Sequence, residues 1–316
     1  MRIAWPGAGR LTLMALAVVP AAMAYPWQTV TGQWALGIAV VVVIILLAQW
    51  RGMFFTTMLK RRIALLGARE SGGGAHQLVQ RTEADAQTTA VLRVLPESDG
   101  DLPLDVIAGY LDRYGLRCEA VRVTSRNTPG ERTTWIGLTM SAATNLTELQ
   151  ARSPRIPLRD TAEVTLRRLA DHLRELGWAV TTSEVDVPDI LGPQAKPKWR
   201  AVQDGEGSYV TAYAIDVNDA LPETLDKLWA YSSPEVWTAV QITPGVRVAA
   251  AAAIRTDELP DRGGAPLAGL NPLRGYQLEA LDALSPNAAD PLPGARVGTV
   301  DVAALRWPAG AEKVRT

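Results

Sequence analysis

The hydrophobic residues of this chain are concentrated in one block near its start. Residues 11–50 carry no charged side chain, although charged residues make up 21% of the 316-residue sequence. Arg10 precedes the block and Arg51 follows it. A stretch this long and apolar is typical of membrane-embedded helices, because the bilayer core penalises every charge. We therefore predict that residues 11–50 anchor the chain in a bilayer.

The block reads as two helices joined by a short uncharged turn, which together form a transmembrane hairpin. The first covers residues 11–24, and the second covers residues 34–50. At about 1.5 Å per residue the second helix spans roughly 26 Å, close to the ~30 Å hydrocarbon core. Basic residues before and after the hairpin place both termini in the cytoplasm by the positive-inside rule. The alternative is a signal peptide cleaved after Ala22-Met23-Ala24, which has the small-x-small pattern of such sites.

Aromatic and basic side chains at the ends of these helices are the candidate membrane-interface or partner-contact residues. Tryptophan rings settle at the headgroup level, and basic side chains pair with anionic headgroups. The same residues could instead dock another membrane subunit, and both interpretations stay open. The second helix could continue as a juxtamembrane helix within residues 51–75, before a glycine-rich linker. The candidates are Trp27, Trp34, Trp50, Phe54, Phe55, Lys60, Arg61 and Arg62.

Beyond the linker, alternating and helical periodicities predict one cytoplasmic α/β domain over residues 76–258. The strongest helix covers residues 161–176, with Asp160 and Glu163 as a capping box and Gly177 as its end. A strand-helix-strand-strand order recurs in both halves, which favours a mixed sheet with helices, in two related layers. Strands are predicted at 90–95, 117–125, 133–141, 178–187, 199–203, 208–217, 236–242 and 246–254, and further helices at 103–114 and 222–231.

The last segment, residues 259–316, is rich in proline, glycine and alanine. It predicts an irregular tail, partly docked and partly disordered, with one short helix at residues 276–284. Residues 1–10 form a short cytoplasmic N-terminus. The domain therefore ends, on this interpretation, where the tail begins.

The chain carries few residues that could perform chemistry. A net charge of −1 gives no nucleic-acid footprint, and two histidines with one cysteine are too few for a zinc site. Cys118 is expected to be a small buried hydrophobe, and His172 a surface or boundary side chain. No catalytic, cofactor or metal residue is predicted. One alternative remains, because Asp99 and Asp101 have the D-x-D form with which membrane-tethered transferases hold a divalent cation.

Several strings in the middle of the chain carry a family resemblance. They are Thr133–Thr139, Asn145-Leu146 with Leu149–Ser153, Ile156–Ala162 and Arg168–Trp178. In this order, and behind a two-span hairpin, they resemble the EccE component of mycobacterial type VII (ESX) secretion systems. The resemblance runs from the hairpin to about Ile254 and is weakest in the tail.

The resemblance implies a non-enzymatic structural subunit of a bacterial inner-membrane secretion complex. On this expectation, the hairpin and the cytoplasmic domain brace neighbouring subunits, and the partners are the EccB, EccC and EccD components together with the lipid bilayer. In that family the ATPase is EccC, which agrees with the missing phosphate-binding loop here. The family has no established catalytic residues, so none are assigned to this chain.

Overall fold

The computed structural model divides the chain into two units, Met1–Gly72 and Gly73–Thr316. It describes residues 49–50, 53–54 and 87–309, apart from gaps at 99, 154–155, 184, 206, 262–263, 293 and 295–296. Among these residues, no helix has both the length and the apolar character needed to cross a membrane. Both predicted spans lie almost wholly outside the described residues, so the hairpin stays a prediction.

In the first unit the described residues form one short antiparallel pair. Strand β1 (Gln49–Trp50) pairs with β2 (Met53–Phe54), with Trp50 opposite Met53. Met53 and Phe54 are therefore extended. The prediction of a helix through these two residues is wrong, because both belong to a β-strand. The remainder of the predicted juxtamembrane helix lies outside the described residues.

The second unit is built on one twelve-stranded sheet in which every recorded pair is antiparallel. The prediction of an α/β domain with helices on a sheet is confirmed, but the sheet is not mixed. Along its main path the order is β7-β3-β6-β5-β11-β12-β10-β9-β8. The strands are β3 (Gln87–Val94), β4 (Asp112–Arg113), β5 (Leu116–Thr128), β6 (Glu131–Ser141), β7 (Val180–Thr181), β8 (Lys196–Pro197), β9 (Val202–Gln203), β10 (Tyr209–Ile215), β11 (Glu235–Thr243), β12 (Arg247–Thr256), β13 (Leu270–Pro272) and β14 (Gly298–Thr299).

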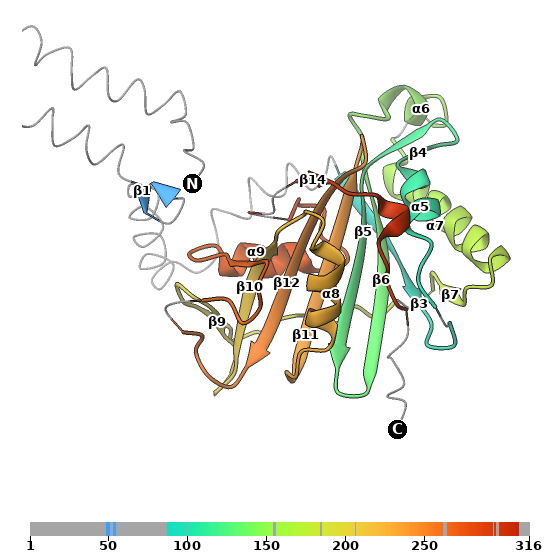
Figure 1. The fold of residues 1–316 in the computed structure, drawn as a ribbon. Helices are drawn as coiled ribbons and strands as arrows, with labels where there is room; N and C mark the ends of the chain where they lie inside the picture. The colour runs from blue at the N-terminus through green and yellow to red at the C-terminus, as the bar shows by residue number, and fades with distance from the viewer. Residues whose placement is uncertain are drawn as a thin grey trace, which may run out of the picture. The chain divides into compact units, whose positions relative to one another are not determined.

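The two halves of the sequence form the two halves of this sheet. In the first half a helix connects β3 to β5, and β6 lies between these strands. In the second half a helix connects β10 to β11, and β12 lies between them. Both halves are therefore split β-α-β units, joined where β5 pairs with β11. The predicted repeat is confirmed, but the halves lie side by side in one sheet instead of in two layers (Figure 1).

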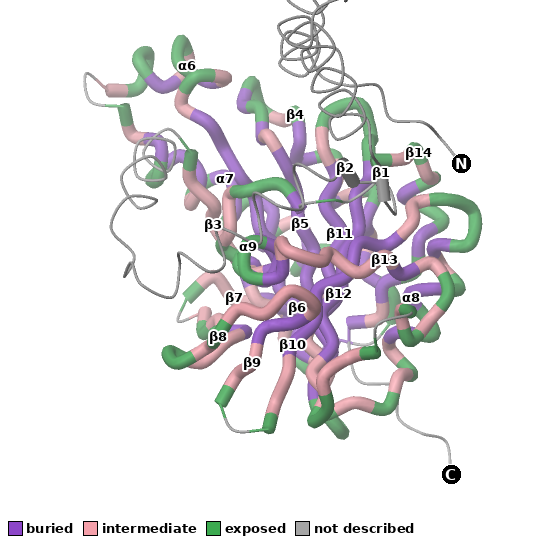
Figure 2. Tube along the Cα trace, turned by 90° about the vertical axis from the view of Figure 1, so that its left-hand side faces the viewer, coloured by how far each residue is buried: buried purple, intermediate pink, exposed green. Residues whose placement is uncertain are grey.

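Helices cover both faces of the sheet. Three pack with the larger hydrophobic cluster on one face, and the helix near the C-terminus packs with the second cluster on the other face, as Figure 1 shows. The central strands between them are buried along most of their length (Figure 2). The helices of the first face are α5 (Leu104–Ala108), α7 (Leu158–Glu175) and α8 (Leu221–Trp229), and the helix of the second face is α9 (Gln277–Leu284). The remaining short elements are α6 (Leu146–Gln150) and the 3-10 helices η1 (Gly109–Leu111) and η2 (Val302–Ala304).

Helix α7 confirms the strongest helix prediction but differs from it at its N-terminus. It begins at Leu158, three residues before the predicted start, and Pro157 is its N-cap without a side-chain hydrogen bond. The predicted capping box does not form, because Asp160 and Glu163 already lie inside the helix. Proline suits this position, since it lacks the N–H that the first turn leaves unpaired. At the other end Gly177 has φ +90°, as the C-terminal prediction requires.

Two further predicted elements are shorter than expected. The helix expected over 103–114 ends as α5 and η1, and the chain then enters β4. Of the strand expected over 178–187, only β7 forms. The other predicted strands and the helix at 222–231 are present with boundaries shifted by a few residues at most, except that β9 covers only the last two residues of 199–203.

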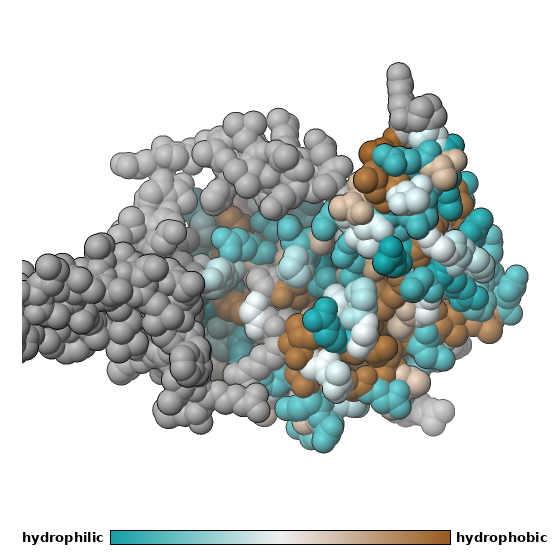
Figure 3. Space-filling model, turned by 90° about the horizontal axis from the view of Figure 1, so that it is seen from above, coloured by the Kyte–Doolittle hydropathy of each residue, from teal (hydrophilic) through white to brown (hydrophobic). Residues whose placement is uncertain are grey.

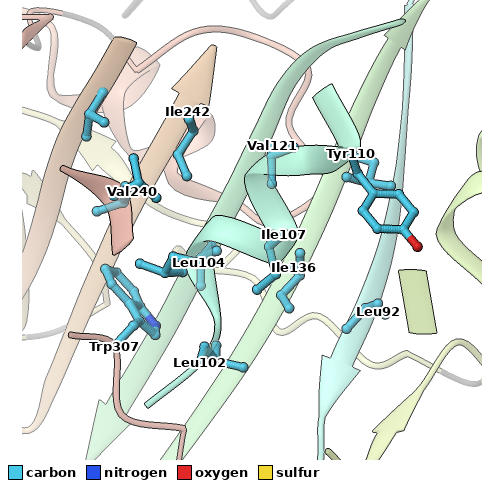
Figure 4. Packing of buried hydrophobic residues seen from close by; sticks show 14 of the residues in the cluster. Leu92, Leu102, Leu104, Ile107, Tyr110, Val121, Ile136, Val240, Ile242 and Trp307 are labelled. Atoms are coloured by element: carbon cyan, nitrogen blue, oxygen red, sulfur yellow. The ribbon is translucent and has the colours of Figure 1, made fainter. Parts of the chain in front are cut away.

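The tail belongs to the core of the second unit as far as Ala309. Trp307 is fully buried beside α5, where Leu102 and Leu104 also lie (Figure 4). Its indole N–H donates to Ser125 Oγ at 2.9 Å, and Leu102 N–H donates to the Trp307 carbonyl at 2.8 Å. The predicted short helix is confirmed as α9. Composition alone gives no sign of this docking, because a few large side chains hold the segment in place.

Candidate interaction surface

The structure does not describe the side chains of the residues predicted at the membrane interface. Trp50 and Phe54 contribute only their backbone, in β1 and β2. The other candidates lie outside the described residues; they are Trp27, Trp34, Phe55, Lys60, Arg61 and Arg62. Their role at the bilayer or at a partner subunit therefore stays a prediction.

The alternative metal site loses its support at Asp101. This carboxylate accepts a hydrogen bond from Arg306 Nε at 2.9 Å, and the backbone of Asp101 bridges to Pro308. Asp99 lies outside the described residues. Within the described ranges, no three histidine, cysteine or acidic side chains gather as a metal site would need. Asp101 thus fastens the tail to the start of α5.

Cys118 and His172 occupy the environments that the sequence predicts. Cys118 is 1% exposed, and burial, together with the nearby Glu119 carboxylate, raises the pKa of its thiol to about 12. Such a thiol stays protonated and unreactive at neutral pH. His172 is half-buried on α7, with its Nδ1 3.5 Å from the Tyr110 hydroxyl oxygen. The thiol is thus a core residue and the imidazole a boundary residue.

Arg122, in the middle of β5, is a buried charged residue that the sequence does not predict; it is only 2% exposed. It donates to the carbonyl oxygens of Ala283 at 2.6 Å, Ser285 at 3.1 Å and Ala288 at 3.2 Å, and also to that of Asp290. These carbonyls belong to the C-terminal end of α9 and the loop after it, where a cation is favoured. Burial lowers the pKa of Arg122 to about 10, so it remains charged at neutral pH.

A second polar network fixes the opposite part of the same sheet face. Glu235 on β11 pairs with Arg126 and with Arg255, whose Nε lies 2.7 Å from a Glu235 oxygen. Arg255 also binds Asp204 at 2.7 Å and the carbonyl oxygen of Ile190 at 2.8 Å. These contacts join the three strands β5, β11 and β12 to one another, to the coil before β8 and to the turn after β9. Both networks hold distant segments of the fold together.

One end of the sheet has the properties of a binding surface. Strands β5 and β12 both begin there, since each pairs antiparallel with β11, and this is the upper end in Figure 1. Tyr114, before β5, and Val246, before β12, are 57% and 50% exposed. Leu146, which begins α6 after the end of β6, is also exposed. Seen from above, Figure 3 shows hydrophobic residues interspersed with hydrophilic ones.

Tyr114 and Val246 are also the two described non-glycine residues with positive φ, at +57° and +54°. For a bulky or β-branched residue this conformation costs about 1–2 kcal/mol. Neither side chain recovers that cost by burial, because both are exposed. Strain retained on exposed side chains points to a role in binding. Sequence reasoning missed both residues, since a turn of this kind usually carries asparagine or glycine.

Comparison with known proteins places the chain in a family. Residues 128–215 match the family described as "Putative type VII ESX secretion system translocon, EccE". The chain is 45% identical over 293 residues to ESX-3 secretion system protein EccE3 of Mycolicibacterium smegmatis, covering 91% of each chain. It is 43% identical over 314 residues to the EccE3 protein of Mycobacterium tuberculosis strain H37Rv, covering 96% of this chain and 93% of the relative. The chain therefore belongs to the EccE family of type VII (ESX) secretion system components, as the sequence resemblance predicted.

Proposed function

We propose that this protein is a non-enzymatic structural subunit of an inner-membrane ESX secretion complex, of the ESX-3 type. The observation that carries the proposal is similarity to ESX-3 EccE3 proteins over more than nine tenths of the chain. In this proposal the transmembrane hairpin inserts at the edge of the complex, and the cytoplasmic domain braces neighbouring subunits. The partners are the EccB, EccC and EccD components and the lipid bilayer. Both termini lie in the cytoplasm.

The architecture of the second unit supports a bracing role. Its single sheet is covered on both faces, and its tail is fastened by Trp307 and Arg306. Its described polar clusters tie segments of the chain to one another. A rigid body of this kind transmits force between contacts without chemistry of its own. The alternative transferase function gains nothing from the structure, because Asp101 is engaged by Arg306.

The proposal is tested by removing the subunit and then restoring it in parts. Cells that lack this protein are complemented with the full chain, with a variant lacking residues 11–50, or with Asp101→Ala. Secretion of ESX substrates and mild-detergent co-purification of the Ecc proteins are measured. We expect the full chain and Asp101→Ala to restore both, and the variant without the hairpin to restore neither. Normal assembly and secretion without the subunit would refute the proposal, and loss of secretion in assembled Asp101→Ala complexes would favour the transferase.

A further inference from the structure

A two-residue turn presents Tyr114 at one end of the sheet. Strands β4 and β5 pair with Arg113 opposite Leu116, so Tyr114 and Gly115 alone form the turn. Their φ values of +57° and +72° are those of a type I′ turn. Asparagine is the favoured first residue of this turn and would adopt it with less strain. The chain instead places an aromatic ring there and leaves it exposed.

Two guanidinium groups flank this ring. The Cζ atoms of Arg168, on α7, and Arg113, on β4, lie 4.9 Å and 5.3 Å from the Tyr114 ring centroid. Beneath them Tyr110 makes an edge-to-face contact with Tyr114, with ring centroids 6.5 Å apart. The Tyr110 hydroxyl donates to the Arg168 carbonyl oxygen at 3.1 Å, and Figure 4 shows this hydroxyl pointing away from the cluster of packed side chains around α5. Tyr110 therefore supports the Tyr114 ring and holds the backbone of α7 at Arg168.

The pairing of Arg168 differs from that of the other three arginines of α7. Arg159, Arg167 and Arg174 each pair with a carboxylate of the same helix. Arg113 and Arg168 have no carboxylate partner among the residues that the structure describes. Arg113 instead lies 3.4 Å from His172 Nδ1 and 4.7 Å over the Tyr110 ring.

No described carboxylate lies within ion-pair distance of either arginine, although the charge of Glu175 raises the pKa of Tyr110 slightly. Asp112 alternates with Arg113 along β4 and so points to the opposite side. Positive charge thus gathers around one exposed aromatic ring. Carboxylates are the groups that guanidinium binds with two parallel hydrogen bonds.

We infer that Tyr114, Arg113 and Arg168 form a docking site for an acidic segment of a partner protein. Aspartate or glutamate side chains of that segment pair with the two guanidinium groups, and a neighbouring apolar group packs on the Tyr114 ring. Tyrosine and arginine are the residues most often responsible for affinity at interfaces. A membrane surface fits less well, because anionic lipid is recognised by clusters of about four to eight basic residues. The inference rests on the proposed function and names one surface through which it operates.

The test uses the full chain in its membrane complex. Tyr114→Asn keeps the turn and relieves its strain, so its melting temperature should equal or exceed that of the wild type. The double variant Arg113→Gln/Arg168→Gln removes both cations. Arg167→Gln, one residue away on α7 but paired with Glu163, is the matched control. Binding is measured as complex retained after mild-detergent purification at 0.1 M and 0.5 M salt.

We expect Tyr114→Asn and the double variant each to reduce retention at least about tenfold, as loss of an interface hot spot does. The control should retain the wild-type amount. High salt should weaken the wild type and leave the double variant unchanged, because only the wild type has the charge pairs to screen. A photo-crosslinking amino acid at position 114 should then join to a partner peptide that contains several carboxylates.

Four results would overturn the inference. The first is wild-type retention by both variants, and the second is cross-linking to a segment without acidic residues. The third is that the variants no longer bind phosphatidylglycerol vesicles but still retain the partner protein, which would assign the site to lipid. The fourth is a fall in retention for Arg167→Gln that equals the fall for the double variant. Failure of the wild-type chain itself to co-purify with any Ecc component would instead refute the proposed function, so the two failures are distinguishable.

Discussion

Replacing Arg122 by methionine removes the guanidinium that forms hydrogen bonds with the C-terminal end of α9 and the loop after it. Methionine keeps the aliphatic stem and its packing, so the change isolates the polar contacts. Those contacts are donated to four carbonyl oxygens and, at 3.4 Å, to Gln241 Oε1. Without the guanidinium the carbonyl oxygens of Ala283 and Asp290 lose a donor that they regain only if the loop after α9 moves to reach water. The other three acceptors, in Ser285, Ala288 and Gln241, each keep a second donor. The variant should therefore unfold more easily, and it should do so first at this loop.

The magnitude follows from the same contacts. A hydrogen bond to a charged group contributes about 1.5–3 kcal/mol, and only the shorter contacts count in full. Relief from burying a charge offsets part of the loss, as the lowered pKa of Arg122 indicates. With two carbonyl oxygens losing their donor, and that relief included, the net loss we expect is about 3–5 kcal/mol. For a unit of this size the melting temperature should fall by roughly 6–20 °C.

Thermal unfolding and hydrogen exchange of the full chain in detergent measure both effects. Exchange should accelerate over residues 277–292 while β5 and β6 stay protected. Arg167→Met, on the exposed side of α7, is the control and should change stability by less than about 0.5 kcal/mol. The reasoning fails if Arg122→Met melts within 2 °C of the wild type (a change of about 1 kcal/mol or less) with unaltered exchange over that segment.

Three further changes probe other parts of the core. Gly137→Ala would place a Cβ 2.7 Å from a backbone oxygen of the loop after α9, so it should destabilise by about 1–3 kcal/mol; Gly109→Ala, where nothing lies within 4 Å, should be near neutral in the same denaturant titration. Trp307→Ala should cost about 3–5 kcal/mol and Trp307→Phe less, although both lose the hydrogen bond to Ser125; equal stability of Trp307→Ala and wild type would show that the tail is not part of the core. The third experiment labels Cys118 with iodoacetamide at pH 8 and follows the reaction by mass spectrometry. Because the pKa of its thiol is raised to about 12, Cys118 should resist labelling in the native protein and react after unfolding in urea. Fast labelling of the native protein would contradict its burial.

The sequence predicted the elements whose signals are local. The β5–β6 hairpin follows from alternation on both sides of Pro129-Gly130, and Gly130 has the positive φ that the turn requires. Helix α7 follows from an apolar stripe, of which Leu166, Leu169 and Leu173 are buried. Such patterns extend over ten to twenty residues and survive in any tertiary context. They explain why most strands of the sheet were found.

The sequence could not predict contacts between distant segments. The pairing of β5 with β11 brings together residues such as Val123 and Val240, and nothing near either strand specifies the other. Arg122 appears in the sequence as an arginine between two valines, and its partners are backbone carbonyls that have no sequence signature. The Tyr114 site shows the same limit, because Arg168 reaches it only when α7 packs on the sheet. The candidate interface therefore emerged from the structure alone.

The two halves of the sheet are repeats in topology, yet they depend on each other. The helix after β6 covers the face that also holds α5 and α8, whereas the helix after β12 covers the opposite face. The first half therefore leaves one face that α9 of the second half covers. Arg122 of the first half holds the end of α9, and Trp307 of the tail packs against Ser125 of the first half. The first repeat is therefore not a complete domain by itself, and the rigidity on which the proposed bracing role relies belongs to the whole unit.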